Sequence, residues 1–586
     1  VMADESWWRG HYRLAEALML QRADNSLDDA VNAFHAAWKL QPDILEDVGA
    51  VELAFSTGWL GCLTTILPQE TGSPKPAYSE QPSSAFAESF GMRFHGTGPV
   101  VVVGKVPHKH LVESVWEALR FIESAVKVGA YPQLQGTIVF LPGIHSNPPE
   151  HSSMPALYID GQDGRVDTLD FIGLGTTIVK NSSSTSTVST AVFGGSCNVR
   201  LRGVRLIQEY ETWDPAINVS FAMKLVNNSC VSLQDCHIQN KCGLCVQTRE
   251  QAQLNLSDVS FSASYSAIAV HESSQLVCDR ISIVDMRFNG IEITTSRTVS
   301  ISRSKIRRAG RAGIACYSKG LAMPKLLLEQ TELSHTGSLW AETTTPNSAL
   351  QVNGLACNTL ELEVVVRDCR IMDNFGYGLY LEGVHFRIER SAIAHSGLGS
   401  ALRSLQDALA SVPVTAQSRG AFVDCSLGDA CNSMGGAVQF AFNRGAEVVF
   451  QRCAIGGAIR VSADDVVPAI VPLTESMPNI KRYRIPTRRD LMADFAAAFH
   501  VALPGDDIPD GFVQKSFESW ERRRAMKKPG EVDPKHARHC SGCGESERQL
   551  PLCKFSKCSG CKAVYYCSSR CQKNNWKVHK ALCNAI

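Results

Sequence analysis

The feature that most constrains the fold is a repeat of 22 or 23 residues in the middle of the chain. Apolar residues recur at two positions of each unit, five residues apart. The first position holds Leu233, Leu256, Cys278 and Ile301, and the second holds Ile238, Phe261, Ile283 and Ile306. A unit of this length is too short to bury its own apolar face, so successive units must stack and share one core. The repeat therefore predicts a solenoid.

Each unit contains two or three short stretches in which apolar and polar residues alternate between turns, and this pattern predicts strands. A leucine-rich repeat of similar length would carry a Leu-rich consensus with an Asn or Cys step, which is absent here. We therefore expect a mainly β chain folded as a parallel β-helix, in which each strand pairs with the coils on either side. Later units show the same two apolar positions, five residues apart, at Val366/Ile371, Ile388/Ile393 and Phe450/Ile455.

Two stretches near the start of this region resemble the right-handed, pectate-lyase-like β-helix superfamily. TIVFLPGIH at Thr137–His145 looks like the opening strand and turn of that family, and LDFIGLGTTIV at Leu169–Val179 looks like its next coil. The resemblance covers residues 98–461 and implies a right-handed coil. HLVESVWEALRFIESA at His110–Ala125 has helical spacing, and we expect it to cap the N-terminal end of the coils.

Strand alternation predicts which side chains point into the coils. Ile283 and Ile293 should point inward, stacked against Phe261 and Val270 on one side and against Ile306 and Cys316 on the other. Four cysteines that precede the second apolar position by two residues should also be buried, as free Cys usually is. They are Cys236, Cys369, Cys425 and Cys453. For the Cys242-x2-Cys245 pair we expect Cys242 in a turn and Cys245 facing outward, without metal or redox chemistry.

Enzymes of the β-helix superfamily cleave acidic polysaccharides and need clustered carboxylates with a basic residue. The acids here are scattered, and four of them share the position before the inward cysteine site, where a turn-forming role is expected. These four are Asp235, Asp258, Asp368 and Asp424. The basic run on one coil favours a solvated face or a patch for an acidic partner over a catalytic clamp. It consists of Arg303, Lys305, Arg307, Arg308 and Arg311. We therefore expect no catalytic residues and no organic cofactor.

Eight cysteine and histidine residues near the C-terminus form four closely spaced pairs. They are Cys540/Cys543, Cys558/Cys561, Cys567/Cys571 and His579/Cys583. Disulfides would need neither a histidine nor such regular pairing, whereas four pairs are enough for two closed tetrahedral zinc sites. His579 and Cys583 lie one helical turn apart in KNNWKVHKAL, which contains no Gly or Pro. The spacing predicts two Zn²⁺ ions.

This segment closely resembles the MYND-type zinc finger over Cys540 to Cys583, including YYC at Tyr565–Cys567, Trp576 and the HK pair that begins at His579. The resemblance implies two interleaved sites. One would use Cys540, Cys543, Cys567 and Cys571, and the other Cys558, Cys561, His579 and Cys583. The long gap after Cys543 contains Cys553, an alternative ligand, but only Cys558 makes a C-x2-C pair with Cys561.

MYND fingers usually bind proteins that carry short proline-containing motifs and do not read DNA bases. As peptide-binding residues we predict Tyr565, Gln572 and Trp576. Gln572 offers donors and an acceptor to an extended backbone, and the two aromatic rings can pack against proline. For Trp576 an equally plausible role is packing beneath the helix.

At the N-terminus, DAVNAFHAAWKLQPD has the residue spacing of the second helix of a tetratricopeptide repeat, and WWRGHYRLAEALM fits the first. One repeat does not fold alone, so either more repeats precede Val1 or the helix pair docks on the next part of the chain.

The predicted domains are a helical segment (1–66), a Pro/Ser-rich linker (67–97), the β-helix (98–461), a helical connector (462–535) and the finger (536–586). The fold class is thus mainly β, a right-handed parallel β-helix with N-terminal helices and a small two-zinc finger.

Charge is balanced, with 58 Lys and Arg against 58 Asp and Glu, so no global field draws the chain to nucleic acid or to a membrane. Residues 1–30 lack the pattern of a secretory signal, and no run of 18 apolar residues occurs. We expect an intracellular protein, cytoplasmic or nuclear.

The favoured function is a zinc-binding adaptor, and the alternative is a carbohydrate-active β-helix enzyme. A methyltransferase of the SET class is excluded, because its Asn-His-x-Cys motif and Gly-rich start are absent.

Overall fold

The computed structural model describes most of the coils and short parts of the rest of the chain. The described residues are 6–21, 26–57, 59–60, 100–105, 111–127, 135–146, 154–161, 167–181, 189–208, 221–241, 243–262, 264–317, 325–337, 348–353, 363–374, 377–382, 384–394, 419–428, 438–440, 447–455, 459–461, 556–557, 565–566 and 572. The chain divides into two compact units, residues 1–210 with 220–507 and residues 211–219 with 508–586. The predicted linker 67–97 and connector 462–535 lie outside the described residues.

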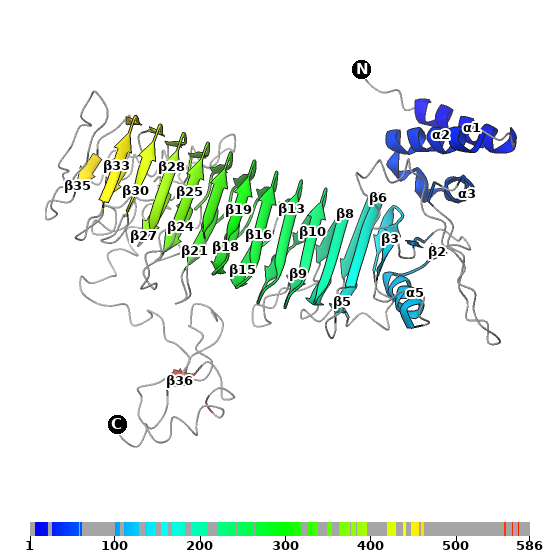
Figure 1. Ribbon diagram of the computed structural model, residues 1–586, viewed down its shortest axis with the longest axis horizontal. Coiled ribbons are helices and arrows are strands. Elements are labelled where there is room, and N and C mark those ends of the chain that lie inside the picture. Colours follow the sequence, from blue (N-terminus) through cyan, green and yellow to red (C-terminus); the bar gives the residue numbers. More distant parts are fainter. Residues whose placement is uncertain are drawn as a thin grey trace, which may run out of the picture. The chain divides into compact units, whose positions relative to one another are not determined.

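The N-terminal segment is helical, as its amphipathic pattern predicts (Figure 1). Its elements are α1 (Ser6–Gln21), α2 (Ser26–Leu40), the 3-10 helix η1 (Pro42–Glu46) and α3 (Val48–Ser56). An aromatic cluster closes this group, because the ring of Trp59 lies 5.2 Å from both Phe34 and Trp38. The turn at Pro42 and Asp43 packs against Gly175 of the first coils, where φ is +71° and a side chain would clash. The helix group therefore docks on the β-helix, and its tetratricopeptide character stays a prediction.

Parallel strands in stacked coils form the main body of the first unit, which confirms the predicted fold class (Figure 1). Within the described residues, 24 strands form one sheet, here sheet A. They are β1 (Val100–Val103), β2 (Leu111–Val112), β3 (Gln135–Phe140), β4 (Gly143–His145), β6 (Asp167–Asn181), β8 (Cys197–Gln208), β10 (Cys230–Gln234), β11 (His237–Asn240), β13 (Gln253–Ser257), β14 (Ser260–Ser262), β16 (Gln275–Asp279), β17 (Ser282–Val284), β19 (Val299–Ser302), β20 (Lys305–Arg307), β22 (Leu326–Glu329), β23 (Glu332–Ser334), β25 (Glu363–Arg367), β26 (Arg370–Met372), β28 (His385–Glu389), β29 (Ala392–Ala394), β30 (Arg419–Val423), β31 (Ser426–Leu427), β33 (Glu447–Gln451) and β34 (Ala454–Ile455).

A second parallel sheet, here sheet B, closes the other side of the coils with nine strands. They are β5 (Leu157–Gly161), β7 (Ala191–Gly195), β9 (Phe221–Leu225), β12 (Leu244–Thr248), β15 (Ser266–Glu272), β18 (Ile291–Thr295), β21 (Ile314–Tyr317), β24 (Ser348–Asn353) and β27 (Tyr377–Glu382). Two further strands, β32 (Val438–Phe440) and β35 (Ile459–Val461), pair in parallel. Helix α5 (Val115–Lys127) lies at the β1–β3 end of the coils (Figure 1). It begins five residues after the predicted start of the cap helix, because Leu111–Val112 is the strand β2.

The predicted coil register is confirmed. Leu233 pairs with Leu256, Leu256 with Cys278, and Cys278 with Ile301 in consecutive coils. Ile283 stacks between Phe261 and Ile306, and Ile293 stacks between Val270 and Cys316, with both isoleucine side chains fully buried. The apolar positions read from the sequence therefore form one continuous core.

A left-handed residue bends each coil between its two sheet A strands. The same position has a φ of +46° to +56° in nine coils, although none of these residues is glycine. They are Asp235, Asp258, Arg280, Arg303, Gln330, Asp368, Arg390, Asp424 and Arg452, here called the corner ladder. The backbone N–H of Asp424 donates to the carbonyl of Gln451 in the next coil at 2.9 Å, and the earlier members of the ladder make the same bond. The turn-forming role expected for the four aspartates is confirmed.

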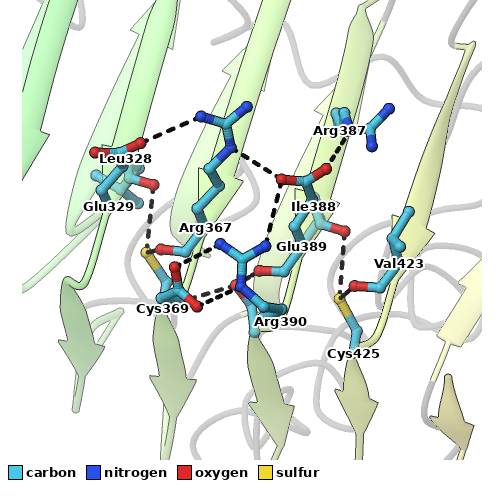
Figure 2. Close-up of polar contacts among 12 residues, drawn as sticks. Leu328, Glu329, Arg367, Cys369, Arg387, Ile388, Glu389, Arg390, Val423 and Cys425 are labelled. Atoms are coloured by element: carbon cyan, nitrogen blue, oxygen red, sulfur yellow. Dashed lines mark hydrogen bonds and ion pairs between the residues drawn. The ribbon is translucent and has the colours of Figure 1, made fainter. Parts of the chain in front are cut away.

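The residue after each corner points inward, and where it is Cys, Ser or Thr it also contacts carbonyl groups at the bend. The Cys369 Sγ lies 3.1 Å from the Arg367 oxygen and 3.5 Å from the Leu328 oxygen of the preceding coil (Figure 2). Ser391 occupies the same position one coil later, and its hydroxyl donates to the Glu389 carbonyl at 2.8 Å. Cys236, Cys369, Cys425 and Cys453 are all buried, as predicted.

The expected outward orientation of Cys245 is wrong. Its side chain is fully buried, and its Sγ lies 2.9 Å from the Ser264 hydroxyl oxygen. The reason is that Cys245, Val246, Gln247 and Thr248 are buried in succession along β12, so alternation does not mark an outer face there. Cys242 lies outside the described residues.

Candidate functional site

The second unit contains the paired cysteines, and its described residues form a short hairpin. Strand β36 (Ser556–Lys557) pairs antiparallel with β37 (Tyr565–Tyr566), so that Lys557 lies opposite Tyr565. Tyr566 is 2% exposed, which makes it the buried anchor of this pair. In the sequence Cys558 follows β36 directly and Cys567 follows β37 directly. The eight predicted zinc ligands and Trp576 lie outside the described residues, whereas Gln572 is helical and half-buried.

The donor set of this segment fits zinc. Thiolate sulfur and imidazole nitrogen are the ligands that structural zinc takes, and seven cysteines with one histidine supply two complete tetrahedra. In the sequence, Cys558 and Cys561 lie between the two strands, and Cys567 follows the second strand.

On the coils, the predicted scattered acids lie next to arginines of neighbouring coils. Asp258 accepts two hydrogen bonds of 2.6 Å from Arg280. Asp424 accepts bonds of 2.5 and 2.6 Å from Arg452, one coil later in the corner ladder. The same arrangement joins Asp368 to Arg390, Asp285 to Arg308, and Asp279 to Arg303. In each pair the arginine hydrogen bonds lower the pKa of the carboxyl group.

Glu389 forms the centre of the largest such network, and sequence analysis did not single it out. Its side chain accepts a hydrogen bond of 2.9 Å from Arg367 and another from Arg387 (Figure 2). Arg390 lies 3.8 Å away on the other side, and Arg367 also reaches Glu329 at 3.4 Å. Glu389 is 8% exposed, and the hydrogen bond from Arg387 is the main reason that its pKa is lowered. Hydrogen bonds from two arginines thus favour the ionised form of this carboxylate.

The basic run between Arg303 and Arg311 is also occupied. Arg307 donates two hydrogen bonds to Glu332 at 3.0 and 2.9 Å, and Arg308 donates to Asp285. The Arg311 guanidinium lies 3.8 Å from the ring centroid of Phe288, which itself stacks on Tyr265. The four arginines therefore contact groups of the coils, while Arg303, Lys305 and Arg308 remain exposed to solvent.

The pKa shifts of the described carboxyl groups all have the same direction. A general acid needs a carboxyl group whose pKa is raised toward neutrality. Every described carboxyl group whose pKa departs from its ordinary value is lowered, because an arginine donates to it. In the described ranges, no group of three or more His, Cys, Asp and Glu side chains is placed to hold a metal ion. The described helices include none that is long and apolar enough to cross a membrane.

Two family models match the chain. The MYND finger model matches residues 540–583, and the model of the right handed beta helix region matches residues 225–412. The second match includes the corner ladder from Asp235 to Arg390, whose bends define the coils.

Several curated proteins match short segments. A SET and MYND domain-containing protein of Dictyostelium discoideum is 43% identical over 53 residues, which are 9% of this chain and 10% of that protein. The N-lysine methyltransferase SMYD2 of Gallus gallus is 42% identical over 48 residues, 8% of this chain and 10% of that protein. Tudor domain-containing protein 1 of Oryzias latipes is 32% identical over 122 residues, 20% of this chain and 8% of that protein. The chain spans about a tenth of each of these relatives.

Two solved structures match the chain at low similarity. The mannuronan C-5 epimerase AlgE4 A-module of Azotobacter vinelandii is 11% identical with a TM-score of 0.29, covering 60% of this chain and 95% of the module. Tailspike protein 2 of bacteriophage CBA120 is 9% identical with a TM-score of 0.30, covering 51% of this chain and 43% of that one. At these TM-scores the likeness carries no argument about activity. From its family matches and its strand topology, the chain combines a right-handed parallel β-helix with a C-terminal MYND finger, a zinc-binding interaction module.

Proposed function

We propose that this chain is a non-catalytic adaptor in which the MYND finger binds short proline-containing peptides and the β-helix offers a second binding surface. The observation that carries the proposal is the match of residues 540–583 to an interaction module whose eight ligand positions are all present. The balanced charge of the chain supports protein partners over DNA bases or an anionic membrane. The domain boundaries and the intracellular, cytoplasmic or nuclear location are part of the same proposal.

The finger would hold two zinc ions in interleaved sites, with Cys540, Cys543, Cys567 and Cys571 on one ion and Cys558, Cys561, His579 and Cys583 on the other. When bound, the zinc ions supply the folding free energy of the segment and no chemistry on a substrate. Zinc binding keeps the thiols as thiolates, so a reducing compartment suits the finger. The buried free cysteines of the coils suit the same compartment, because none of the nine described cysteines of the coils is in a disulfide.

Gln572 is the peptide contact with the most support. It is half-buried and helical, and it is not among the predicted zinc ligands. A side-chain amide can pair with both the N–H and the C=O of an extended peptide. Tyr565 and Trp576 would pack against proline rings of the same peptide.

The test is fluorescence anisotropy of labelled proline-containing peptides on the zinc-loaded full chain. Gln572→Ala should weaken binding at least several-fold while zinc content stays unchanged. Gln549→Ala, between Cys543 and Cys558, is the matched control and should bind normally. Equal affinity of the Gln572→Ala variant and the wild type would remove Gln572 from the site. Binding that survives deletion of residues 536–586 would place peptide recognition elsewhere.

The alternative function, a carbohydrate-active β-helix, makes a separate prediction. It requires a carboxyl group free to exchange a proton, and the described acids of the coils that sequence analysis singled out are ion-paired with arginine. When the full chain is incubated with polygalacturonate, the length of the polysaccharide should therefore stay unchanged. Degradation that persists after deletion of residues 536–586 would establish the enzyme and refute the adaptor.

A further inference from the structure

Cys425 and Cys453 lie at the same position of consecutive coils. The flanking strand pairs fix this register, because Val423 lies opposite Gln451 and Ser426 lies opposite Ala454. The N–H of Ala454 donates to the Cys425 carbonyl at 2.9 Å. Among the described residues, this is the one place where two cysteines occupy equivalent positions of neighbouring coils.

The two thiols point into the interior at the bend, one coil apart. Each follows a corner-ladder residue, and each points inward, with Cys425 2% and Cys453 7% exposed. The Cys425 Sγ lies 3.3 Å from the oxygens of Ile388 and Val423, as Figure 2 shows. One coil later, the Cys453 Sγ makes the equivalent contact with the preceding coil, 3.3 Å from the Phe422 oxygen. In-register parallel neighbours are about 4.8 Å apart, which falls within the Cα separation of about 4.4–6.8 Å that a disulfide spans.

We propose that Cys425 and Cys453 are a site of reversible oxidation, at which a hydroperoxide converts the two thiols into a disulfide that links adjacent coils. The bond would link two residues that are 28 positions apart in the sequence. Such a link stabilises the coils mainly by restricting the unfolded chain.

The chemistry divides the roles between the two thiols. The hydrogen bond from Cys425 lowers the pKa of the Cys453 thiol, although burial acts in the opposite direction. In Cys236, Cys245 and Cys316 burial dominates and raises the thiol pKa to about 12. Cys453 is the more exposed of the pair, and on that ground we assign it as the nucleophile and Cys425 as the resolving thiol.

The step balances with hydrogen peroxide as the hydroperoxide. The Cys453 thiolate attacks one peroxide oxygen, the O–O bond breaks, and the hydroxide that leaves takes a proton to become water. Cys453 is then a sulfenic acid. The Cys425 sulfur attacks the Cys453 sulfur, the S–O bond breaks, and the hydroxide leaves as a second water with the Cys425 proton. Two thiols lose two electrons and two protons, and the peroxide is reduced to two waters.

The experiment treats the reduced, zinc-loaded full chain with hydrogen peroxide, blocks remaining thiols with N-ethylmaleimide and digests it without reductant. Mass spectrometry should find the Cys425 and Cys453 peptides joined, two hydrogens lighter than the free pair. The Tm of the coils should rise by several degrees and return after reduction. Recovery of both peptides as alkylated thiols, or of Cys453 as a sulfinic acid without the crosslink, would overturn the proposal.

Two variants separate this pair from other thiols. Cys453→Ser should abolish both the crosslink and the Tm rise, and it fits the fold because Ser391 already occupies the equivalent position of an earlier coil. Cys369→Ser is the matched control, since Cys369 has the same orientation but lies next to Thr331 and Ser391 instead of a cysteine. It should retain the crosslink and the rise. A rise that persists in Cys453→Ser would assign the effect to other residues.

Discussion

Arg390 lies one coil after Asp368 at the same left-handed corner and donates two hydrogen bonds to its carboxylate, of 2.8 and 2.7 Å. A backbone bond accompanies this contact, because the N–H of Asp368 donates to the carbonyl of Glu389. An arginine in the left-handed region is strained, and its bidentate contact with the neighbouring coil offsets part of that strain. The Arg390 side chain also approaches Glu389 at 3.8 Å, which joins the corner to the network of Figure 2.

The network predicts that Glu389→Gln destabilises the coils. The substitution keeps the shape but removes the charge that Arg367 and Arg387 contact from either side. Hydrogen bonds to charged groups contribute about 1.5–3 kcal/mol each, and the retained amide oxygen limits the loss to about that range. Urea unfolding followed by circular dichroism measures the change in free energy. Asp424→Asn is the control, because Asp424 forms an exposed pair with Arg452 alone. Its free energy of unfolding should fall by less than that of Glu389→Gln. Equal losses would show that the network adds nothing to a simple pair.

Ile293→Asp should disrupt the core. Ile293 is fully buried between Val270 and Cys316, so the new carboxylate would have no partner. The cost should exceed about 3 kcal/mol. Arg297→Asp, at an exposed turn position that comes later on the same coil, should change stability little. Thermal unfolding of both variants decides the matter, and a wild-type Tm for Ile293→Asp would contradict the packing described above.

His145 predicts a loss of stability in acid. Burial lowers the pKa of its imidazole, and nearby Lys105 lowers it further, although the Leu141 carbonyl, 2.7 Å from Nε2, acts in the opposite direction. The unfolded chain therefore binds the proton more readily. This contribution is constant at neutral pH, and the free energy of unfolding falls as the pH drops below the unfolded pKa of about 6.5.

The measurement for His145 compares Tm at pH 7.5 with Tm at pH 5. His145→Gln retains a donor for the Leu141 carbonyl without titrating in this range, so it should show a smaller decrease between the two conditions. His237, whose pKa is also lowered by burial and by Arg205, remains in both proteins and provides the background decrease. An identical decrease in the variant would exclude His145 as a source of the acid sensitivity.

Zinc analysis tests the finger directly. We expect two zinc ions per chain by mass spectrometry of the metal content. Cys567→Ser should lower that number and unfold the finger, because structural zinc supplies on the order of 10–16 kcal/mol in small fingers, while the Tm of the coils stays unchanged. Cys553→Ser, in the long gap before Cys558, should retain both ions. Loss of an ion in Cys553→Ser would make Cys553 a ligand and revise the pairing.

The core of the coils was predictable because burial imposes a period on the sequence. Ile283 and Ile293 recur at positions that only an apolar residue can fill, so their partners can be deduced from the repeat length alone. Aspartate also indicates the bend, since it tolerates the left-handed conformation. Arg280, Arg303, Arg390 and Arg452 gave no such signal, because arginine adopts this conformation only where a carboxylate of another coil holds it.

Other features depend on contacts between coils that local patterns do not contain. Glu389 looks like an ordinary surface residue in the sequence, and its role requires arginines that are brought together by stacking. Cys245 was misplaced because β12 is buried on both faces, where alternation is uninformative. The zinc ligands of the finger, in contrast, follow from a local sequence pattern. Ligand spacing is local chemistry, so the zinc pairs were predictable from the sequence, whereas their geometry stays a prediction.

The corner ladder also bears on how the coils find their order. Its last four members alternate in charge, Asp368, Arg390, Asp424 and Arg452, and each aspartate contacts the arginine of the next coil. If a coil skipped its neighbour and stacked on the next but one, Asp368 would face Asp424 and Arg390 would face Arg452. Like charges at contact distance repel. The coils offer similar apolar interiors, so this alternation of charge at the corners favours stacking of each coil on its immediate neighbour over stacking that skips one coil.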